Sequence, residues 1–390
     1  MTVAILGQDL HHRFEGNGCR LLYLVGQLRL GGLERQLYYL LAGMDRGRYR
    51  PAVVVWNLDL SDKYYADIEA LNIPIAGLPV EWSPLHKLQA FRTLSRHLGP
   101  EVIHSYSFHT NFAAYYAGRG SRALAIGSLR SGFIFAKSDG GMIRGALNAR
   151  WPSCLIANSV AAAETARRYS GPFAPRQVFV VRNGLDLNRF SHTHESSRIG
   201  NYVAAVGSLF PVKRWDRLLR VIKQVVDMDI GIRDIRFRIA GAGPLRNSLE
   251  KLAQDLGISQ NVEFMGEIYN IPAFLEDAQF LVHTSESEGC PNAVMEAMAC
   301  GRAVVAMDAG EIPFLIEDGE TGFVVPGGDE TRFTERVFHL LSDNELCRHM
   351  GLAARAKAER EFKLDRLVSE TLDVYRAAGW KDKILDLMKK

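Results

Sequence analysis

This chain of 390 residues lacks long apolar runs, internal repeats and low-complexity tracts. No stretch approaches the roughly 18 apolar residues that a helix needs to span a bilayer. The residues before position 18 hold only a short apolar segment followed by Asp, His and Arg, so we expect no signal peptide. The missing repeat period argues against solenoids and other repeat arrays. These absences favour a cytoplasmic globular protein.

Cysteine is also scarce, and no part of the sequence has the pattern of a metal site. The five cysteines are scattered and form no Cys-x-x-Cys pair, so we expect reduced thiols. No group of His, Asp and Cys has the spacing of metal ligands. We therefore expect neither a bound metal nor another cofactor. The cysteines stand at positions 19, 154, 290, 300 and 347.

Acidic residues are under-represented in the first half of the chain. Residues 1–190 carry 22 Lys and Arg against 13 Asp and Glu, a net charge of +9. The remainder carries 25 against 31, a net charge of −6. The N-terminal half is therefore expected to face an anionic partner, such as a lipid-phosphate acceptor or a membrane surface; the alternative is a solvated basic surface without a partner. No motif or dense basic run indicates a nucleic acid.

What is present is the composition of an ordinary soluble protein, with 47% hydrophobic and 23% charged residues. A chain of this length exceeds what one hydrophobic core usually supports, so two domains are expected. Short apolar segments alternate with helical or turn-rich stretches, which predicts an α/β fold of two Rossmann-like halves with parallel sheets. The polar stretch 191–200 is the best linker candidate. Strands are expected at 21–25, 52–56, 102–105, 124–127, 155–157 and 178–181, and then at 202–206, 237–240, 262–265, 280–282, 303–306 and 323–325.

The segment 285–301, SESEGCPNAVMEAMACG, carries the most specific functional signal. Glu288 follows the expected strand at 280–282, and the carboxyl ends of parallel strands are where open sheets bind ligands. Glu296 is expected in the first turn of a helix that begins near residue 293. Two carboxylates beside a helix N-terminus suit a ligand with hydroxyls at both ends and an anionic middle, as in a nucleotide sugar. The alternative is an acidic residue that only offsets the helix dipole.

Glycine-containing loops follow the first expected strand of each half. Gly31 and Gly32 precede a helix, so their backbone can approach a phosphate closely, although such a pair is often only a tight turn. In the second half, Lys213 stands six residues after Gly207 and can place an ammonium over a phosphate. A Lys-Arg pair at a helix start opposes the helix dipole, which favours an anion at this position.

Together these features resemble the retaining glycosyltransferases of family four, or glycosyl transferases group 1, which have the GT-B fold. Glu288 and Glu296 match the E-x7-E motif of that family. The sequence departs from the family at Ser208, where an Arg is common, and at Tyr106, where a His is common. Further matches occur in the right order at residues 31–34, 183–186, 240–245 and 308–311.

The resemblance implies two Rossmann-like domains that face a central cleft. Residues 1–190 would form an acceptor-binding domain and residues 191–365 a nucleotide-sugar-binding domain. Residues 366–390 would form C-terminal helices that return to the first domain.

The resemblance also implies roles for individual residues. Glu288 would hold hydroxyls of the donor sugar, Glu296 the ribose diol, and Lys213 the diphosphate. His109 would hydrogen-bond the donor sugar or the acceptor, unless it is structural, and Arg130 would bind the acceptor. Glu288, Lys213 and His109 are the catalytic candidates, and His104 is expected to pack beneath the sheet. The expected donor site is Gly31, Gly32, Ser208, Lys213, Arg214, Gly241, Tyr269, Glu288, Gly289, Cys290, Pro291, Asn292, Ala293 and Glu296.

The implied reaction moves a sugar, with retention, from a nucleotide-diphosphate donor to a glycan, glycolipid or polyprenyl-linked acceptor in polysaccharide or glycoconjugate synthesis. A UDP-sugar is favoured, with a GDP-sugar as the alternative donor. The basic N-terminal domain would let the enzyme lie peripherally on the inner face of the membrane. Two other functions remain open: a UDP-sugar epimerase, and a non-catalytic protein that binds nucleotide sugars.

Overall fold

The computed structural model describes residues 14, 18–139, 141–169, 171–190, 200–228 and 235–382. The chain divides into two compact units, which are described separately. Unit 1 comprises Met1–Gly184 and Leu364–Lys390, and unit 2 comprises Leu185–Lys363. Most of the expected linker, residues 191–199, lies outside the described residues. None of the described helices is long and apolar enough to cross a bilayer.

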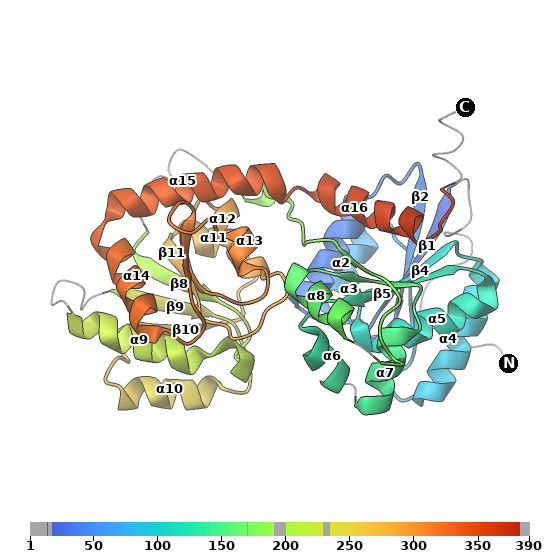
Figure 1. Cartoon of the computed structure of the whole chain (residues 1–390), viewed down its shortest axis with the longest axis horizontal. Helices are drawn as coiled ribbons and strands as arrows, with labels where there is room; N and C mark the ends of the chain where they lie inside the picture. The colour runs from blue at the N-terminus through green and yellow to red at the C-terminus, as the bar shows by residue number, and fades with distance from the viewer. Residues whose placement is uncertain are drawn as a thin grey trace. The chain divides into compact units, whose positions relative to one another are not determined.

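Unit 1 is built on a seven-stranded sheet with the order β3-β2-β1-β4-β5-β6-β7, in which every pair of neighbours is parallel (Figure 1). The strands are β1 (Cys19–Val25), β2 (Tyr49–Val55), β3 (Ile75–Gly77), β4 (Val102–Ser105), β5 (Leu124–Leu129), β6 (Cys154–Ala157) and β7 (Val178–Val180). The helices are α2 (Gly32–Ala42), α3 (Lys63–Ala70), α4 (Pro84–Leu98), α5 (Asn111–Ser121), α6 (Phe133–Asp139), α7 (Met142–Arg150), α8 (Val160–Arg168) and α16 (Leu364–Ala377). A short 3-10 helix, η1 (Phe108–Thr110), precedes α5.

Unit 2 is built on a six-stranded parallel sheet with the order β10-β9-β8-β11-β12-β13. The strands are β8 (Tyr202–Val206), β9 (Arg236–Ala240), β10 (Val262–Gly266), β11 (Ala278–His283), β12 (Val304–Met307) and β13 (Gly322–Val325). The helices are α9 (Trp215–Met228), α10 (Arg246–Asp255), α11 (Ile271–Glu276), α12 (Asn292–Ala299), α13 (Ile312–Leu315), α14 (Glu330–Ser342) and α15 (Asn344–Glu361). Two short 3-10 helices are η2 (Leu187–Arg189) and η4 (Pro211–Lys213).

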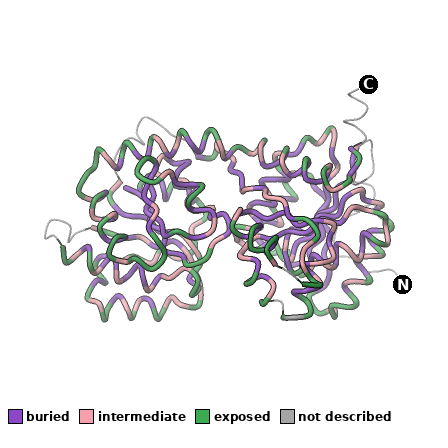
Figure 2. Tube along the Cα trace, in the orientation of Figure 1, coloured by how far each residue is buried: buried purple, intermediate pink, exposed green. Residues whose placement is uncertain are grey.

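The central strands of both sheets are buried on both faces, as Figure 2 shows by their purple trace. Each is a nearly continuous apolar run, because helices cover both faces of a parallel sheet and leave no face for water. The α/β class with two parallel sheets is thus confirmed, and each strand expected from the sequence overlaps an observed one. The sequence analysis missed β3, which has three residues and lies at the sheet edge, too short for an apolar pattern to be recognised.

Buried polar groups fasten α16 to the sheet of unit 1. His104, on β4, is 1% exposed and contacts the Tyr375 hydroxyl through Nδ1 at 2.7 Å and the Ser128 hydroxyl through Nε2 at 2.9 Å. The expectation that His104 packs beneath the sheet is therefore confirmed, because it is buried between β4 and α16. Trp380, just beyond α16, is also buried and donates from Nε1 to the Glu101 carboxylate at 3.1 Å. These side chains of His104, Tyr375, Ser128 and Trp380 are hydrogen-bonded, so their burial avoids the free-energy penalty of an unmade hydrogen bond.

Candidate active site

Both sheets reverse their strand order at one point, and such a point is where open parallel sheets bind ligands. In unit 1 the reversal lies between β1 and β4, and in unit 2 between β8 and β11. The loops that follow these four strands carry most of the residues singled out from the sequence; Arg130, Gly241 and Tyr269 follow β5, β9 and β10 instead. The loops of unit 2 bring together most of the predicted donor-site residues.

In unit 2 the loops after β8 and β11 are joined by hydrogen bonds. The backbone N–H of Glu286 donates to the carbonyl of Val212 at 2.9 Å. The Thr284 hydroxyl donates to the carbonyl of Lys213 at 3.1 Å. These bonds hold the segment that carries Lys213 beside the segment that carries Glu288.

Glu288 lies at the centre of the site, with its side chain 10% exposed. The Lys213 ammonium donates to Glu288 Oε1 at 2.5 Å, and His283 Nε2 lies 2.9 Å from the same oxygen. Burial raises the pKa of the Glu288 carboxyl, but the hydrogen bonds and positive charges of His283 and Lys213 outweigh burial and bring the pKa well below its ordinary value. The carboxylate therefore stays ionised and can only accept hydrogen bonds, as from sugar hydroxyls.

His283 is a site residue that the sequence analysis missed. It is the last residue of β11, its side chain is 5% exposed, and it lies five positions before the carboxylate that it contacts. The signal that could have found it is a histidine at the carboxyl end of an apolar strand, immediately before the E-x7-E segment. Its contact with Glu288 restricts how that carboxylate can turn.

Glu296 is held by α12 and is 1% exposed. The helix begins at Asn292, directly after Pro291, so Glu296 lies past the first turn. The expectation of a first-turn position was wrong, because the helix starts before residue 293. One turn further on is Cys300; burial raises the pKa of its thiol to about 12, and the charges of Glu276 and Glu296 add to that rise.

Two glycines allow the loops around this site to pack backbone on backbone. Gly241, in the loop after β9, has a φ of +152°, and a Cβ on it would lie 1.9 Å from the carbonyl oxygen of Gly207. Gly310, in the loop after β12, has a φ of +59°, and its Cβ would lie 2.2 Å from the carbonyl oxygen of Glu288. Side chains at either position would push apart the loops that carry the site. The Glu311 N–H also donates to the Gly289 carbonyl at 2.9 Å, which fixes the turn before α12.

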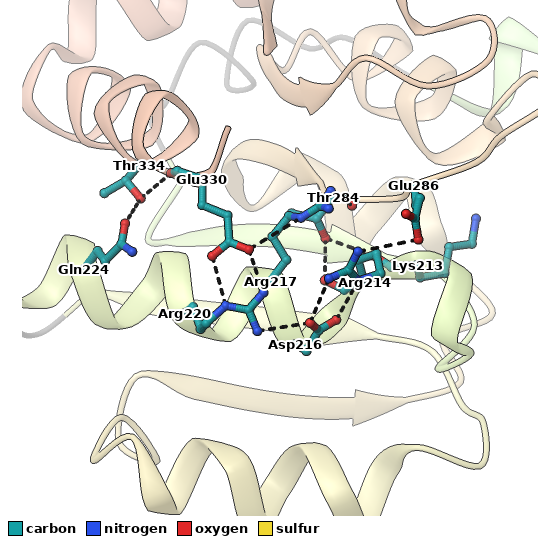
Figure 3. Close-up of polar contacts among 10 residues, drawn as sticks. All are labelled: Lys213, Arg214, Asp216, Arg217, Arg220, Gln224, Thr284, Glu286, Glu330 and Thr334. Carbon is teal, nitrogen blue, oxygen red and sulfur yellow. Dashed lines mark hydrogen bonds and ion pairs between the residues drawn. The ribbon is translucent and has the colours of Figure 1, made fainter. Parts of the chain in front are cut away.

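The structure separates the adjacent Lys213 and Arg214. Whereas Lys213 reaches Glu288, the Arg214 guanidinium forms a bidentate pair with Asp216, at 3.1 and 3.2 Å, and lies 3.5 Å from Glu286 (Figure 3). Arg220 extends this network of ion pairs, because its guanidinium contacts both Asp216 and Glu330. Arg214 thus has carboxylate partners of its own, and its role toward the donor remains a prediction.

The remaining expected donor residues lie around these loops. Ser208 is exposed in the loop after β8, and its carbonyl accepts a hydrogen bond from Trp215 Nε1 at 2.9 Å. Tyr269 follows β10 and is 67% exposed. Cys290 and Pro291 are buried in the turn before α12, and Ala293 lies in the first turn of that helix.

In unit 1 the loops after β1 and β4 are joined by one hydrogen bond, from the Gly26 N–H to the Ser107 hydroxyl at 3.0 Å. Gly31 is the N-cap of α2 and Gly32 is its first residue. The Glu34 carboxylate folds back over Gly31, where a Cβ would lie 2.3 Å from Oε2. Burial raises the pKa of Glu34 to about 7, with the charge of Asp62 adding to the rise against a backbone hydrogen bond that lowers it.

The two expected acceptor residues of unit 1 lie in different surroundings. His109, in η1, has a side chain that is 51% exposed, and its Nε2 lies 3.2 Å from Asp139 Oδ2 on α6. Arg130 directly follows β5, and its guanidinium lies 4.1 Å from the ring centre of Tyr106. Tyr106, at the position where the family often has a His, is fully buried and supports this cation. His109 therefore pairs with an acid, whereas Arg130 stacks on an aromatic ring.

Within the part of the chain that is described, no group of three His, Cys, Asp or Glu side chains could hold a metal ion. The five cysteines are buried, and none of them forms a disulfide in the structure.

Comparison with known proteins agrees with this fold and these loops. The profile of Glycosyl transferases group 1 matches residues 189–357, and that of Glycosyltransferase Family 4 matches residues 30–189. N-acetyl-alpha-D-glucosaminyl L-malate synthase of Bacillus anthracis is 28% identical over 203 residues, which are 52% of this chain and 51% of that protein. D-inositol 3-phosphate glycosyltransferase of Streptomyces bingchenggensis is 30% identical over 241 residues, which are 57% of this chain and 52% of the relative. The chain thus spans about half the length of the curated relatives that it matches.

Among solved structures, Anabaena Alr3699/HepE in complex with UDP and glucose superimposes with a TM-score of 0.79 at 19% identity, over 92% of this chain and 100% of that one. Sucrose-phosphate synthase from Thermosynechococcus elongatus superimposes with a TM-score of 0.75 at 17% identity, over 92% and 98%. At these identities the likeness concerns the fold alone, and that fold is GT-B.

Proposed function

Because the chain belongs to the family-four, or group 1, glycosyltransferases with the GT-B fold, we propose that it transfers a sugar, with retention, from a nucleotide-diphosphate donor to a glycan or lipid-linked acceptor. The observation that carries this proposal is the contact of Lys213 with Glu288 at the switch point of unit 2, with His283 on the same oxygen. A cation and an ionised carboxylate side by side match the two ends of the bond that the reaction breaks.

The mechanism follows from the charges that develop in the transition state. As the bond between sugar and diphosphate breaks, positive charge grows at the anomeric carbon and negative charge on the leaving phosphate. Lys213 stabilises the leaving phosphate by preorganised electrostatics. Glu288 accepts hydrogen bonds from the donor-sugar hydroxyls, and Glu296 accepts them from the ribose diol. The departing phosphate takes the acceptor proton, and His109 hydrogen-bonds the sugar or the acceptor.

A UDP-sugar is the favoured donor, with a GDP-sugar as the alternative. The support is the neighbour Alr3699/HepE, whose complex contains UDP and glucose and whose fold this chain shares. The ring of Tyr269, which follows β10, is exposed, and we propose that the base of the donor stacks on it. Gly31, Gly32, Ser208, Arg214, Gly241 and the turn Gly289–Ala293 complete the proposed donor site.

The acceptor is proposed to be an anionic glycan, glycolipid or polyprenyl-linked sugar bound by unit 1. This unit carries 27 Lys and Arg against 17 Asp and Glu, so its net charge is +10, whereas unit 2 carries 20 against 27, or −7. Arg130, preoriented by its contact with Tyr106, is the cation proposed to bind the acceptor.

Peripheral contact with the cytoplasmic face of a membrane is part of the same proposal. Ile134 and Phe135 on α6 and Ile143 on α7 are exposed by 56%, 61% and 75%. Lys137 and Arg144 stand on the same two helices. Apolar side chains among cations suit the interface of an anionic bilayer.

The experiment that tests the transfer begins with a screen of nucleotide sugars by thermal shift, because a ligand that binds only the folded state raises its melting temperature. The best donor is then incubated with and without candidate acceptors, and free nucleotide, free sugar and glycosylated product are measured. Acceptor-dependent product supports the proposal. Free epimer in a reaction without acceptor would favour a UDP-sugar epimerase, and tight donor binding without turnover on any acceptor would favour a non-catalytic binding protein.

A further inference from the structure

A cavity of about 360 Å³ lies in unit 1 at the sheet edge opposite to the switch point. It is lined by residues at or just before the amino ends of β5, β6 and β7 and by the last turn of α5. Because all of these strands are parallel, their amino ends mark the edge away from Tyr106 and Arg130. The residues that matter here are Tyr115, Arg119, Arg122, Ser153 and Arg176.

The lining of this cavity combines three arginines with no carboxylate. Arg119 and Arg122 come from the end of α5, and Arg176 comes from the segment before β7. Within the described chain, no acidic side chain pairs with any of the three, whereas Arg214 and Arg220 of unit 2 have carboxylate partners. All three arginines are exposed, so water screens their mutual repulsion, and an anion that enters the cavity can contact each of them.

The sequence around the cavity strengthens the charge argument. From residue 102 to residue 138 there is no Asp or Glu, and residues 102–185 contain ten Lys and Arg against two acids. The hydroxyls of Tyr115 and Ser153 supply neutral donors in the same cavity.

A purely structural explanation accounts for only part of this arrangement. Arginines in the last turn of a helix are favoured by the helix dipole, and this explains Arg119 and Arg122. It does not explain Arg176, which belongs to no helix and reaches the same cavity from 54 positions further along the chain. Convergence of separate segments on one concave surface is typical of a binding site.

We propose that this cavity binds a compact ligand with two or more phosphate groups, separately from the nucleotide-sugar site. Guanidinium groups bind phosphate oxygens in bidentate pairs, and three of them offset most of the charge of a diphosphate and part of that of a triphosphate. The volume suits a small molecule. The same chemistry could come from a free polyphosphate or from the phosphorylated end of a larger molecule, and the experiment separates these sources.

The test is titration of the full chain with inorganic tripolyphosphate, followed by calorimetry, in the presence of saturating UDP. We expect one saturable site that UDP does not displace. Arg119→Gln combined with Arg176→Gln should raise the dissociation constant at least about tenfold, because each lost charge-assisted pair weakens binding. Arg122 is left unchanged, since its left-handed backbone, with a φ of +62°, makes substitution a folding risk.

The matched control is Arg144→Gln combined with Arg168→Gln, which removes the same charge from exposed positions on α7 and α8. This control should change the dissociation constant for tripolyphosphate by no more than about twofold. Three results would overturn the proposal: an equal loss of tripolyphosphate affinity in both double variants, displacement of tripolyphosphate by UDP, or the absence of saturable binding. Binding to phosphatidic acid vesicles but not to tripolyphosphate would also overturn it, in favour of a basic membrane-facing surface. Sugar transfer measured in parallel should stay unchanged in the Arg119/Arg176 variant, so this proposal and that of the catalytic function fail independently.

Discussion

At the switch point of unit 2, a carboxylate, an ammonium and an imidazole already contact one another, whereas the polar groups at the switch point of unit 1 contact other parts of their own unit. Glu288 lies within 2.9 Å of both Lys213 and His283. In unit 1, His109 pairs with Asp139 on α6 and Arg130 stacks on Tyr106. The same sheet topology therefore supports two kinds of site.

The difference fits the ligands that the two units are proposed to bind. A diphosphate donor presents fixed charges, so a preorganised set of buried charges reduces the cost of reorganisation when it binds. Acceptors vary among glycosyltransferases of one fold, and residues in loops can change without disturbing the sheet. We therefore expect substitutions in unit 2 to affect the donor and those in unit 1 to affect the acceptor.

The largest expected effect is that of Glu288→Gln, which keeps the shape of the side chain and removes the charge that pairs with Lys213. We expect kcat/KM to fall by about 10²- to 10³-fold, the usual scale for loss of one preorganised electrostatic group. Steady-state transfer assays measure it. The control is Glu286→Gln in the same loop, whose side chain is 65% exposed and should matter by less than about twofold. Near-normal activity of the Glu288 variant would remove this carboxylate from the reaction.

Lys213→Met should follow with a loss of about 10²-fold in kcat/KM, because the methionine fills the space of the lysine stem but leaves the diphosphate without its cation. The rise in donor KM and the fall in kcat are measured separately. Lys223→Met, on the exposed side of α9, is the matched control and should behave as the unchanged enzyme. Comparable losses in the two variants would mean that overall charge, rather than the site, is responsible.

Glu296→Ala should raise the donor KM about tenfold and leave kcat nearly unchanged, as expected for lost hydrogen bonds to a ribose that does not react. Because Glu296 is buried, Glu296→Gln and the melting temperature of both variants are needed to separate binding from folding. An unaltered donor KM in a folded variant would contradict the assigned role.

Arg130→Gln tests the proposed acceptor site of unit 1. The acceptor KM should rise about fivefold while the donor KM stays constant, because this cation is proposed to meet only the acceptor. Arg168→Gln on α8, with a side chain that is 81% exposed, is the control. A change in the donor KM alone would contradict the assignment of the acceptor to unit 1 and of the donor to unit 2.

The last prediction concerns stability rather than activity, and it is a pH dependence at Glu34. Unfolded, its carboxyl loses its proton near pH 4.5, and folded it keeps the proton to about pH 7, so the folded state binds more protons between these values. Its contribution to stability therefore falls as pH rises through this window, by about 3 kcal/mol relative to Glu34→Gln. Melting temperatures of both proteins from pH 4 to pH 8 should diverge as pH rises, with the wild type lower. Parallel curves would mean that Glu34 is not perturbed.

Much of the fold was predictable because it depends on local patterns. Strands buried on both faces must be continuous apolar runs, and this rule located every described strand except β3, whose three residues carry too little pattern. The E-x7-E segment, the glycine loops and Lys213 were equally visible, since each motif lies within a short stretch of chain. The exact start of α12 was not, because residues near a helix start favour several boundaries about equally.

The sequence by itself determined which segments become strands, which loops follow them and which charged residues those loops carry. Only the tertiary structure decided how these residues are paired: that His283 joins Glu288, that Arg214 pairs with Asp216 while its neighbour Lys213 does not, and that Arg176 reaches the cavity at the end of α5. The reason is that backbone patterns act between residues a few positions apart, whereas an ion pair or hydrogen bond depends on distances set by the packing of whole helices and strands.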